Sequence, residues 1–211
     1  MSLRQLPLLL IAVGFLTSCT KNIDNAQLAS TVKAGQGPAK ALYDKGRAAE
    51  AAGKSSKAIK IYRNLARDYP LSSSAPEAKF RQASLLDRSG KLLEAFDEYN
   101  DLLAKYPAST HYTEAIKRQE AVAHAAAGGS LKTPTLIGLK TRVEAKKATE
   151  MLAKVRDNAP RSPSAERAQF TIGEVWENKE SYPKADAAYR QVVRDYPESK
   201  YAPEAQFRIG Q

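Results

Sequence analysis

Histidine and cysteine, which recur at catalytic and metal sites, are scarce in this 211-residue chain. His111 and His124 are the only histidines and stand thirteen residues apart, which predicts ordinary helix positions rather than a metal pair. Cys19 is the single cysteine, so an intramolecular disulfide is excluded. The pair Gly128 and Gly129 lacks the Gly-Lys-Ser/Thr ending of a phosphate loop. No Ser/His/Asp or Cys/His set has a local signature, so we expect a non-enzymatic protein without metal or cofactor.

Cys19 is instead expected to undergo lipid attachment. The apolar run 8–16 is nine residues long, too short for a membrane span of about 20 residues but typical of a signal-peptide core. Leu16 precedes Cys19 by three places, with small Thr17 and Ser18 between them, and this stretch resembles a bacterial lipobox. The resemblance implies removal of residues 1–18, diacylglycerol on the Cys19 thiol and an acyl chain such as palmitate on the new N-terminus. An ordinary signal peptide, or an apolar N-terminus with a chance cysteine, is the alternative.

The segment after Cys19 is polar and is expected to tether the rest of the chain. Residues 19–38 include Gly35 and Gly37 and show no sustained apolar periodicity, which predicts a flexible linker. The residue after Cys19 is Thr20 and not aspartate. In the sorting pattern of bacterial lipoproteins, which the lipobox resemblance brings with it, this implies delivery to the outer membrane. Residues 39–211 are therefore expected on the periplasmic side, close to the outer membrane.

Residues 39–211 carry an internal repeat marked by four prolines, each of which closes a segment such as RDYP or AKYP. The prolines are Pro70, Pro107, Pro160 and Pro197, and alanine stands twelve residues before each, at Ala58, Ala95, Ala148 and Ala185. The first and last intervals are 37 residues and the middle one is 53, which places 16 extra residues inside the third unit. The predicted units are 39–72, 73–109, 110–161 with an insertion at about 128–143, 162–198, and a partial fifth from 199.

One unit has the pattern of two antiparallel helices. Apolar residues recur at three- and four-residue steps over 76–87 and again over 92–106, as amphipathic helices require. The Ser-Gly pair at 89–90 separates these two stretches. Pro107 ends the second helix because it lacks an N–H and clashes with the preceding turn. The sequence therefore predicts an all-α superhelix of antiparallel helix pairs.

The spacing resembles the tetratricopeptide repeat, which has a small residue, an alanine and a proline at fixed places. These places are held by Gly46, Ala58 and Pro70, by Ala83, Ala95 and Pro107, and by Gly173, Ala185 and Pro197. The resemblance implies that the first helix of each pair builds an inner wall that binds partners. The implied wall residues include Lys40, Tyr43, Arg47, Phe80, Ser84, Asp87, Arg88 and Lys117. Lys40, Arg47 and Arg88 could hold a carboxylate, and Tyr43 and Phe80 could receive an aromatic end-group. A solvated helix face is the alternative.

The lipobox, the polar tether, the Tyr-Pro-ended helix pairs and the insertion in the third unit together look like the BamD family. The motifs AIKIYRNLARDYP and SPSAERAQF carry the similarity best. This resemblance implies a scaffold in the assembly and insertion of β-barrel outer-membrane proteins, with barrel-assembly components and unfolded barrel substrates as partners. A periplasmic coordinator of cell-wall synthesis or division, or a pilus-assembly lipoprotein, is the alternative. The insertion would be either a partner-docking loop or a loop folded back on its own repeat.

The net charge is +10, and removal of residues 1–18 takes away Arg4 and leaves +9. Such a balance is common among nucleic-acid-binding proteins. The basic residues are expected to be scattered over helix faces, however, and an exported lipoprotein rarely meets nucleic acid. We therefore expect no nucleic-acid partner, and attribute the charge to attraction toward anionic lipid head groups.

Overall fold

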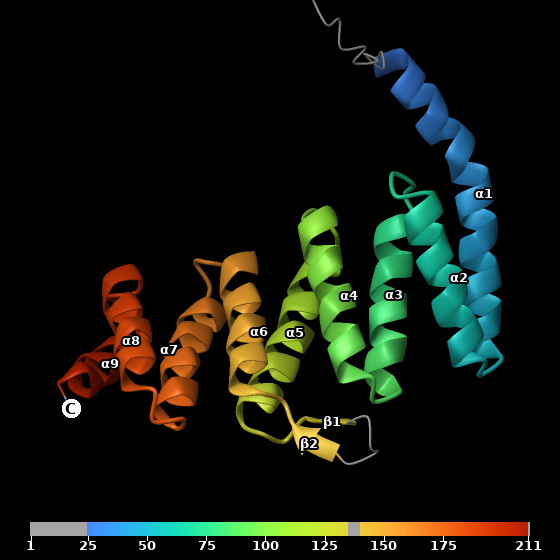
Figure 1. Ribbon diagram of the computed structural model, residues 1–211. Helices are drawn as coiled ribbons and strands as arrows, with labels where there is room; N and C mark the ends of the chain where they lie inside the picture. The colour runs from blue at the N-terminus through green and yellow to red at the C-terminus, as the bar shows by residue number, and fades with distance from the viewer. Residues whose placement is uncertain (1–24, 135–139, 211) are drawn as a thin grey trace, which may run out of the picture.

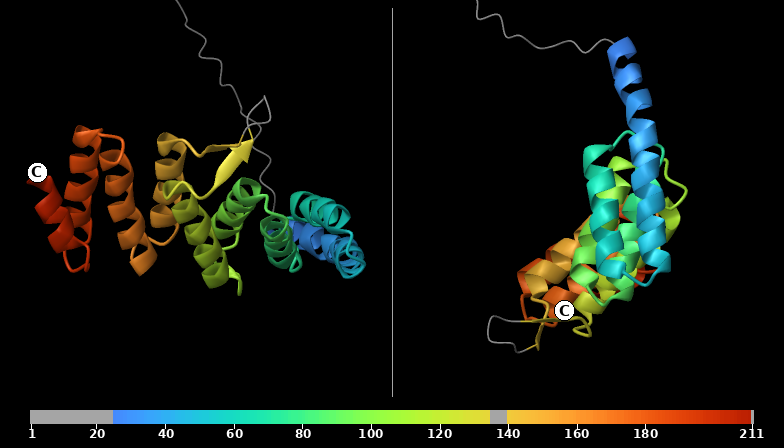
Figure 2. Two further views of the ribbon diagram at one scale, coloured as in Figure 1. Left: turned by 90° about the horizontal axis from the view of Figure 1, so that it is seen from below. Right: turned by 90° about the vertical axis from the view of Figure 1, so that its right-hand side faces the viewer.

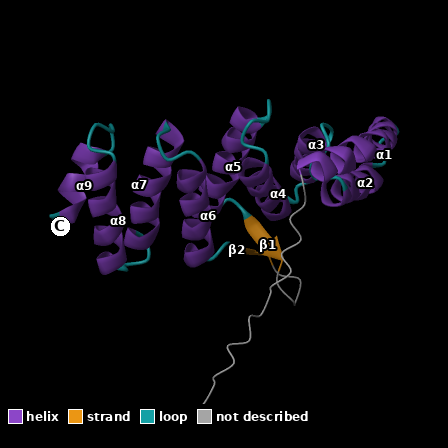
Figure 3. Cartoon of the chain, turned by 90° about the horizontal axis from the view of Figure 1, so that it is seen from above, coloured by secondary structure: helices purple, strands orange, loops and turns teal. Residues whose placement is uncertain are grey.

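The computed structural model describes residues 25–134 and 140–210, so residues 1–18 and the expected lipidation site Cys19 lie outside these ranges. The described chain confirms the predicted all-α superhelix of antiparallel helix pairs, which follow one another along a curved stack (Figure 1). The helices are α1 (Asn25–Ala51), α2 (Ser55–Asp68), α3 (Ala75–Arg88), α4 (Leu92–Lys105), α5 (Tyr112–Ala127), α6 (Ala145–Asn158), α7 (Pro163–Glu177), α8 (Tyr182–Asp195) and α9 (Ala202–Ile209). The short strands β1 (Lys132–Pro134) and β2 (Lys140–Arg142) connect α5 to α6 in the chain and project to one side of the helices (Figure 3).

Small residues let the two helices of a pair pack closely. A Cβ added to Gly46 would lie 2.4 Å from the ring of Tyr62, and one added to Gly173 would lie 2.3 Å from the ring of Tyr189. Both tyrosines are almost fully buried. The repeated alanines of the second helices are at most 4% exposed: Ala58, Ala95, Ala148 and Ala185. The repeat spacing therefore reflects close packing within each pair, because a larger side chain has no room there.

The Tyr-Pro ends of the second helices join one pair to the next. Tyr69 and Tyr106 end α2 and α4, and each backbone N–H donates to the carbonyl four residues earlier, at 2.8 Å. The hydroxyl of Tyr106 also donates to the carbonyl of Pro70 at 3.1 Å. The proline thus stops the helix, while the tyrosine before it can contact the preceding unit.

The first helix begins earlier than expected, and the prediction of a flexible tether is wrong over residues 25–38. The helix α1 starts at Asn25, contains Pro38 and extends beyond its partner α2 (Figures 1 and 2). A Cβ at Gly35 would lie 3.3 Å from the ring of Tyr69. The Gln36 side-chain oxygen accepts hydrogen bonds from the backbone N–H of Ser73 at 3.1 Å and from its hydroxyl at 3.0 Å. These contacts hold the helix against the turn after α2, despite two glycines and a proline that disfavour helix by themselves.

The insertion in the third unit is anchored at both ends. The strands β1 and β2 pair antiparallel, with Lys132 opposite Arg142. Leu131 is 8% exposed in the core between α5 and α6, and Val143 packs against the same core. The described ends of the insertion therefore fold back on their own repeat. Residues 135–139, in the middle of the predicted insertion, lie outside the described ranges. In the described ranges, none of the helices is sufficiently long and apolar for a membrane span.

Candidate binding face

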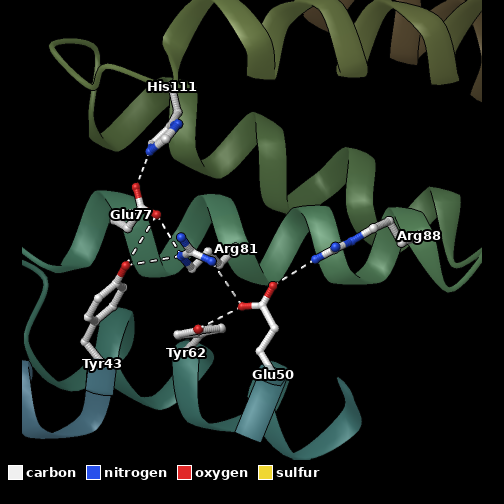
Figure 4. A network of polar contacts seen from close by, with 7 residues as sticks. All are labelled: Tyr43, Glu50, Tyr62, Glu77, Arg81, Arg88 and His111. Carbon is white, nitrogen blue, oxygen red and sulfur yellow. Dashed lines mark hydrogen bonds and ion pairs between the residues drawn. The ribbon is translucent and has the colours of Figure 1, made fainter. Parts of the chain in front are cut away.

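The first helices α1, α3 and α5 carry a continuous set of polar side chains, which we call the first-helix face. Its centre is Arg81 on α3 (Figure 4). The Arg81 Nε donates to Glu77 Oε1 at 2.7 Å and to the Tyr43 hydroxyl at 3.2 Å, and Nη1 donates to Glu50 Oε2 at 3.2 Å. One guanidinium thus joins three side chains from two successive repeats. Such a fork is geometrically specific because the donors of arginine are fixed in one plane.

Glu50 is the second centre of this network. Its carboxylate accepts from Arg88 Nη2 at 2.9 Å and from the Tyr62 hydroxyl at 3.0 Å, in addition to Arg81. Burial alone would raise the pKa of Glu50, but the hydrogen bonds from Arg88, Tyr62 and Arg81 outweigh burial and hold that pKa below its ordinary value. Burial and the neighbouring carboxylate raise the pKa of Tyr62. The pair therefore consists of a charged carboxylate and a neutral phenol at every physiological pH.

His111, at the start of α5, closes the network from the third repeat. Its Nε2 contacts Glu77 Oε2, and its ring stacks on Phe80 with centroids 4.1 Å apart and planes inclined by 6°. Burial acts to raise the pKa of Glu77, but His111 and Arg81 lower it overall. The predicted aromatic acceptor Phe80 is therefore already covered by a ring of the chain itself. The earlier assignment of His111 to an ordinary helix position missed this contact, which sequence alone did not signal.

The same arrangement recurs between α3 and α5. Asp87 Oδ2 accepts from Arg118 Nε at 2.7 Å and from the Tyr99 hydroxyl at 3.3 Å. The Asp87 side chain is only 6% exposed, so Arg118 supplies its compensating charge. Burial, with the nearby Asp87 charge, raises the pKa of Tyr99 to about 12. Asp87, a predicted binding residue of the inner wall, is thus engaged within the chain by Arg118 and Tyr99.

A third copy joins α7 to α9. Glu177 Oε2 accepts from the Tyr189 hydroxyl at 2.6 Å and from Arg208 Nη1 at 2.5 Å. We call each carboxylate–tyrosine–arginine set a latch. The latches are Glu50–Tyr62–Arg81, Asp87–Tyr99–Arg118 and Glu177–Tyr189–Arg208. In each latch the tyrosine follows the carboxylate by 12 residues and the arginine follows it by 31. Alignment of the acidic and basic residues on the repeat would have revealed them.

The junction between α5 and α7 departs from this rule. The repeat-equivalent positions hold His124, Leu152 and Thr171 in place of carboxylate, tyrosine and arginine. His124 Nε2 is buried without a hydrogen-bond partner in the described chain and lies 3.7 Å from Glu120. Burial and the charge of Arg167 lower the pKa of His124, although Glu120 opposes them. This imidazole borders a cavity of about 370 Å³ that Arg167, Phe170 and Tyr201 also line.

The remaining predicted wall residues differ in whether they already have a partner within the chain. Lys40 pairs with Asp44 at 2.7 Å and Arg88 with Glu50, so these two cations already have carboxylate partners. Ser84 is half-buried. Arg47 and Lys117 are exposed and have no ion-pair partner in the described ranges. Of the predicted cations, Arg47 and Lys117 are thus the ones open to a ligand carboxylate.

The described residues contain no group of three or more His, Cys, Asp or Glu side chains that could hold a metal ion. The polar groups of the first-helix face instead pair with one another across repeats. Such a surface can recognise a protein segment by shape, hydrogen bonding and charge, with its side chains already fixed before a partner arrives.

Comparison with known proteins agrees with the helix-pair architecture. One tetratricopeptide-repeat family model matches residues 43–110, and a second matches residues 167–199. No curated protein sequence matched the chain significantly. These two matches lie on either side of the third repeat, which contains the insertion and departs from the regular spacing.

Several solved structures are similar to the chain at low sequence identity. MamA from Desulfovibrio magneticus RS-1 is 19% identical, with 82% of this chain and 85% of that chain covered and a TM-score of 0.36. A tetratricopeptide-repeat protein from Parabacteroides merdae is 16% identical, with 81% and 58% covered and a TM-score of 0.40. A tetratricopeptide-repeat protein from Thermus thermophilus is 16% identical, with 81% and 79% covered and a TM-score of 0.32.

Proposed function

We propose that this tetratricopeptide-repeat protein is a non-enzymatic scaffold that binds protein segments along its first-helix face, and that it serves in β-barrel assembly at the outer membrane. The observation that carries the first statement is the set of interlocked side chains joining α1, α3 and α5. The single side chain of Arg81 hydrogen-bonds both Glu50 of one repeat and Glu77 of the next. A surface fixed in this way loses little conformational freedom when a partner binds, so more of the contact energy remains for affinity.

The cations left over on this face favour partners that carry carboxylates. Arg47 is exposed, and it lies four residues after Tyr43 and three before Glu50, so it shares their side of α1. Lys117 is exposed at the repeat position that Tyr43 and Phe80 occupy in the first two units. A guanidinium and an ammonium without an ion-pair partner among the described residues can both form charge-assisted hydrogen bonds with a partner carboxylate.

The proposal that the protein is located at the outer membrane rests on the sequence around Cys19. The short apolar run 8–16 and the lipobox-like residues up to Cys19 support export and lipid attachment. Two or more acyl chains on one N-terminus would hold the chain stably at a bilayer, because each buried methylene adds about 0.8 kcal/mol. On this proposal the repeats face the periplasm. Loss of outer-membrane fractionation in Cys19→Ala is expected, and unchanged fractionation would reject the anchor.

The role in barrel assembly rests on the resemblance of the lipobox, the Tyr-Pro-ended units and the insertion to the BamD family. A pull-down from detergent extracts tests it. We expect recovery of a large β-barrel protein, and loss of that recovery in Arg47→Glu/Lys117→Glu. The matched variant Lys146→Glu/Lys147→Glu changes the same charge on α6, where both lysines are exposed, and should retain the partner. Recovery of peptidoglycan synthases instead would support the cell-wall alternative and reject barrel assembly.

A further inference from the structure

The second helix of the first pair carries a concentrated row of positive charge. The cations Lys57, Lys60, Arg63 and Arg67 are spaced by three or four residues along α2, so they share one face. All four are exposed, and the buried residues of α2 lie on the opposite side: Ala58, Ile59, Ile61, Tyr62 and Leu65. We call the four cations the α2 row. The expectation that basic residues are scattered over helix faces is therefore wrong at α2.

The α2 row borders a hollow of about 500 Å³ between α2 and the turn from α3 to α4. Lys60, Arg63, Arg67 and Lys91 line this hollow, whereas Glu94 is the one carboxylate among its lining residues. Arg67 pairs with Asp68 at 2.7 Å and Lys91 lies 3.4 Å from Glu94. Two serines at the start of α2 also line it. Lys60 and Arg63 have no ion-pair partner in the described chain, so the hollow has an uncompensated positive charge.

The neighbouring second helix shows that this charge is not a property of the repeat. Helix α2 carries the four cations of the row and a single carboxylate, Asp68. Helix α4 carries one cation, Lys105, and four carboxylates: Glu94, Asp97, Glu98 and Asp101. The positions equivalent to Lys57 and Lys60 are Glu94 and Asp97. The row of cations on α2 is therefore not repeated on α4.

We propose that the α2 row docks the chain onto the anionic phosphate head groups of a lipid bilayer. From Lys57 to Arg67 the helix advances about 15 Å, so the row can meet several head groups in one plane. A nucleic acid fits less well, because the acidic α4 interrupts any basic track for its backbone, and no aromatic residue lines the hollow for base stacking. The contact goes beyond the proposed scaffold function, since it requires neither a protein partner nor a lipid on Cys19.

Vesicle co-sedimentation tests this proposal with the full chain carrying Cys19→Ala, so that no acyl chain contributes. We expect binding to vesicles containing phosphatidylglycerol, weaker binding to phosphatidylcholine vesicles, and loss of the difference in high salt. The variant Lys57→Gln/Lys60→Gln/Arg63→Gln should bind the anionic vesicles about tenfold or more weakly. The matched variant Lys146→Gln/Lys147→Gln/Lys179→Gln removes the same charge from exposed sites elsewhere and should bind within about twofold of the parent.

Equal loss in the two triple variants, or no loss in the α2 variant, would overturn the proposal. Binding to duplex DNA that depends on the α2 row, without such dependence on vesicles, would also overturn it. The pull-down that tests the scaffold function reads protein recovery alone. The failure of one proposal is therefore distinguishable from the failure of the other.

Discussion

The junctions between successive first helices are of two kinds. Three junctions, α1 to α3, α3 to α5 and α7 to α9, are joined by a latch in which an arginine of the later helix meets a carboxylate of the earlier one. The fourth, α5 to α7, has no latch, and there the two first helices pack directly on each other. Ala123, Ala126 and Ala168 are buried in this contact region. Small side chains thus bring these two helices into direct contact, and in place of a latch Arg167 Nη1 lies 3.6 Å from Glu120 Oε1 across the junction.

The difference between the two kinds of junction shows that the tyrosine position of the second helix and the small-residue position of the first helix change together. Where the second helix supplies a tyrosine, the first helix supplies Gly46, Ala83 or Gly173 to admit its ring. The third repeat has Leu152 in the tyrosine position and Glu120 in the small-residue position. Glu120 then accepts a hydrogen bond from Ser164 at 2.6 Å across the junction. A repeat that loses the tyrosine therefore loses the need for a small residue, and a different polar contact becomes possible.

The tyrosine of a latch should contribute mainly by packing. Tyr99 is 1% exposed, so Tyr99→Ala should lower the free energy of unfolding by about 3–5 kcal/mol. Tyr99→Phe keeps the ring and removes one hydrogen bond, so it should cost about 1 kcal/mol. Chemical denaturation with both variants measures the difference. Equal losses in the two variants would assign the effect to the hydroxyl and contradict the packing role.

The charges of the latch should matter only where a latch exists. Arg118→Ala leaves the buried Asp87 without its cation and should cost about 1.5–3 kcal/mol. Thr171→Ala alters the equivalent position of the latch-free junction and should change stability by less than about 0.5 kcal/mol. Thermal unfolding of the two variants under the same buffer compares them. A loss for Thr171→Ala as large as that for Arg118→Ala would abolish the distinction between the junctions.

Two glycines of α1 should respond to the same substitution with effects of different size. Gly46→Ala places a Cβ 2.4 Å from the ring of Tyr62 and should cost about 1–3 kcal/mol through overpacking. A Cβ at Gly37 meets nothing within 4 Å apart from its chain neighbours, but Pro38 follows directly and its ring crowds a preceding Cβ in a helix. Gly37→Ala should therefore change stability by less than about 1 kcal/mol, since this crowding opposes the usual gain of alanine over glycine. Urea midpoints of the two single variants decide the question. A stabilising Gly46→Ala would show that Tyr62 does not need the space.

The two kinds of junction should also lose stability at different pH. The pKa of His124 is lowered in the fold, so its contribution is complete above the ordinary value of 6.5 and is lost as the pH falls through the lower, folded value. The pKa of Glu50 is likewise lowered, and its contribution is lost only below its ordinary value of 4.5. His124→Gln should therefore remove the loss that starts below pH 6.5 and leave the more acidic one. Parallel unfolding curves for the variant and the parent from pH 7 to pH 5 would refute this assignment.

The regular part of the fold followed from the sequence because its signals are local. Apolar steps of three and four residues, small residues opposite tyrosines, and prolines after each second helix identify the pairs without a structure. The early start of α1 did not follow, since Gly35, Gly37 and Pro38 disfavour helix and their compensation comes from Tyr69 and Ser73 on another element. Most of the predicted wall residues proved to be engaged within the chain. Lys40 pairs locally with Asp44, four residues away. The arginine and carboxylate partners of Tyr43, Asp87 and Arg88 stand 31 to 38 residues away, a distance at which only the repeat, and not local periodicity, could have paired them.

The most direct test of the scaffold function is site-specific photo-crosslinking in intact cells. A photoreactive residue at Arg47 or Lys117 probes the first-helix face, and one at Lys105 or Arg190 probes exposed positions of the second helices α4 and α8. The account predicts crosslinks to a β-barrel protein from the first two positions and none from the other two. Crosslinks confined to the second-helix positions, or equal at all four, would contradict a binding role for the first-helix face.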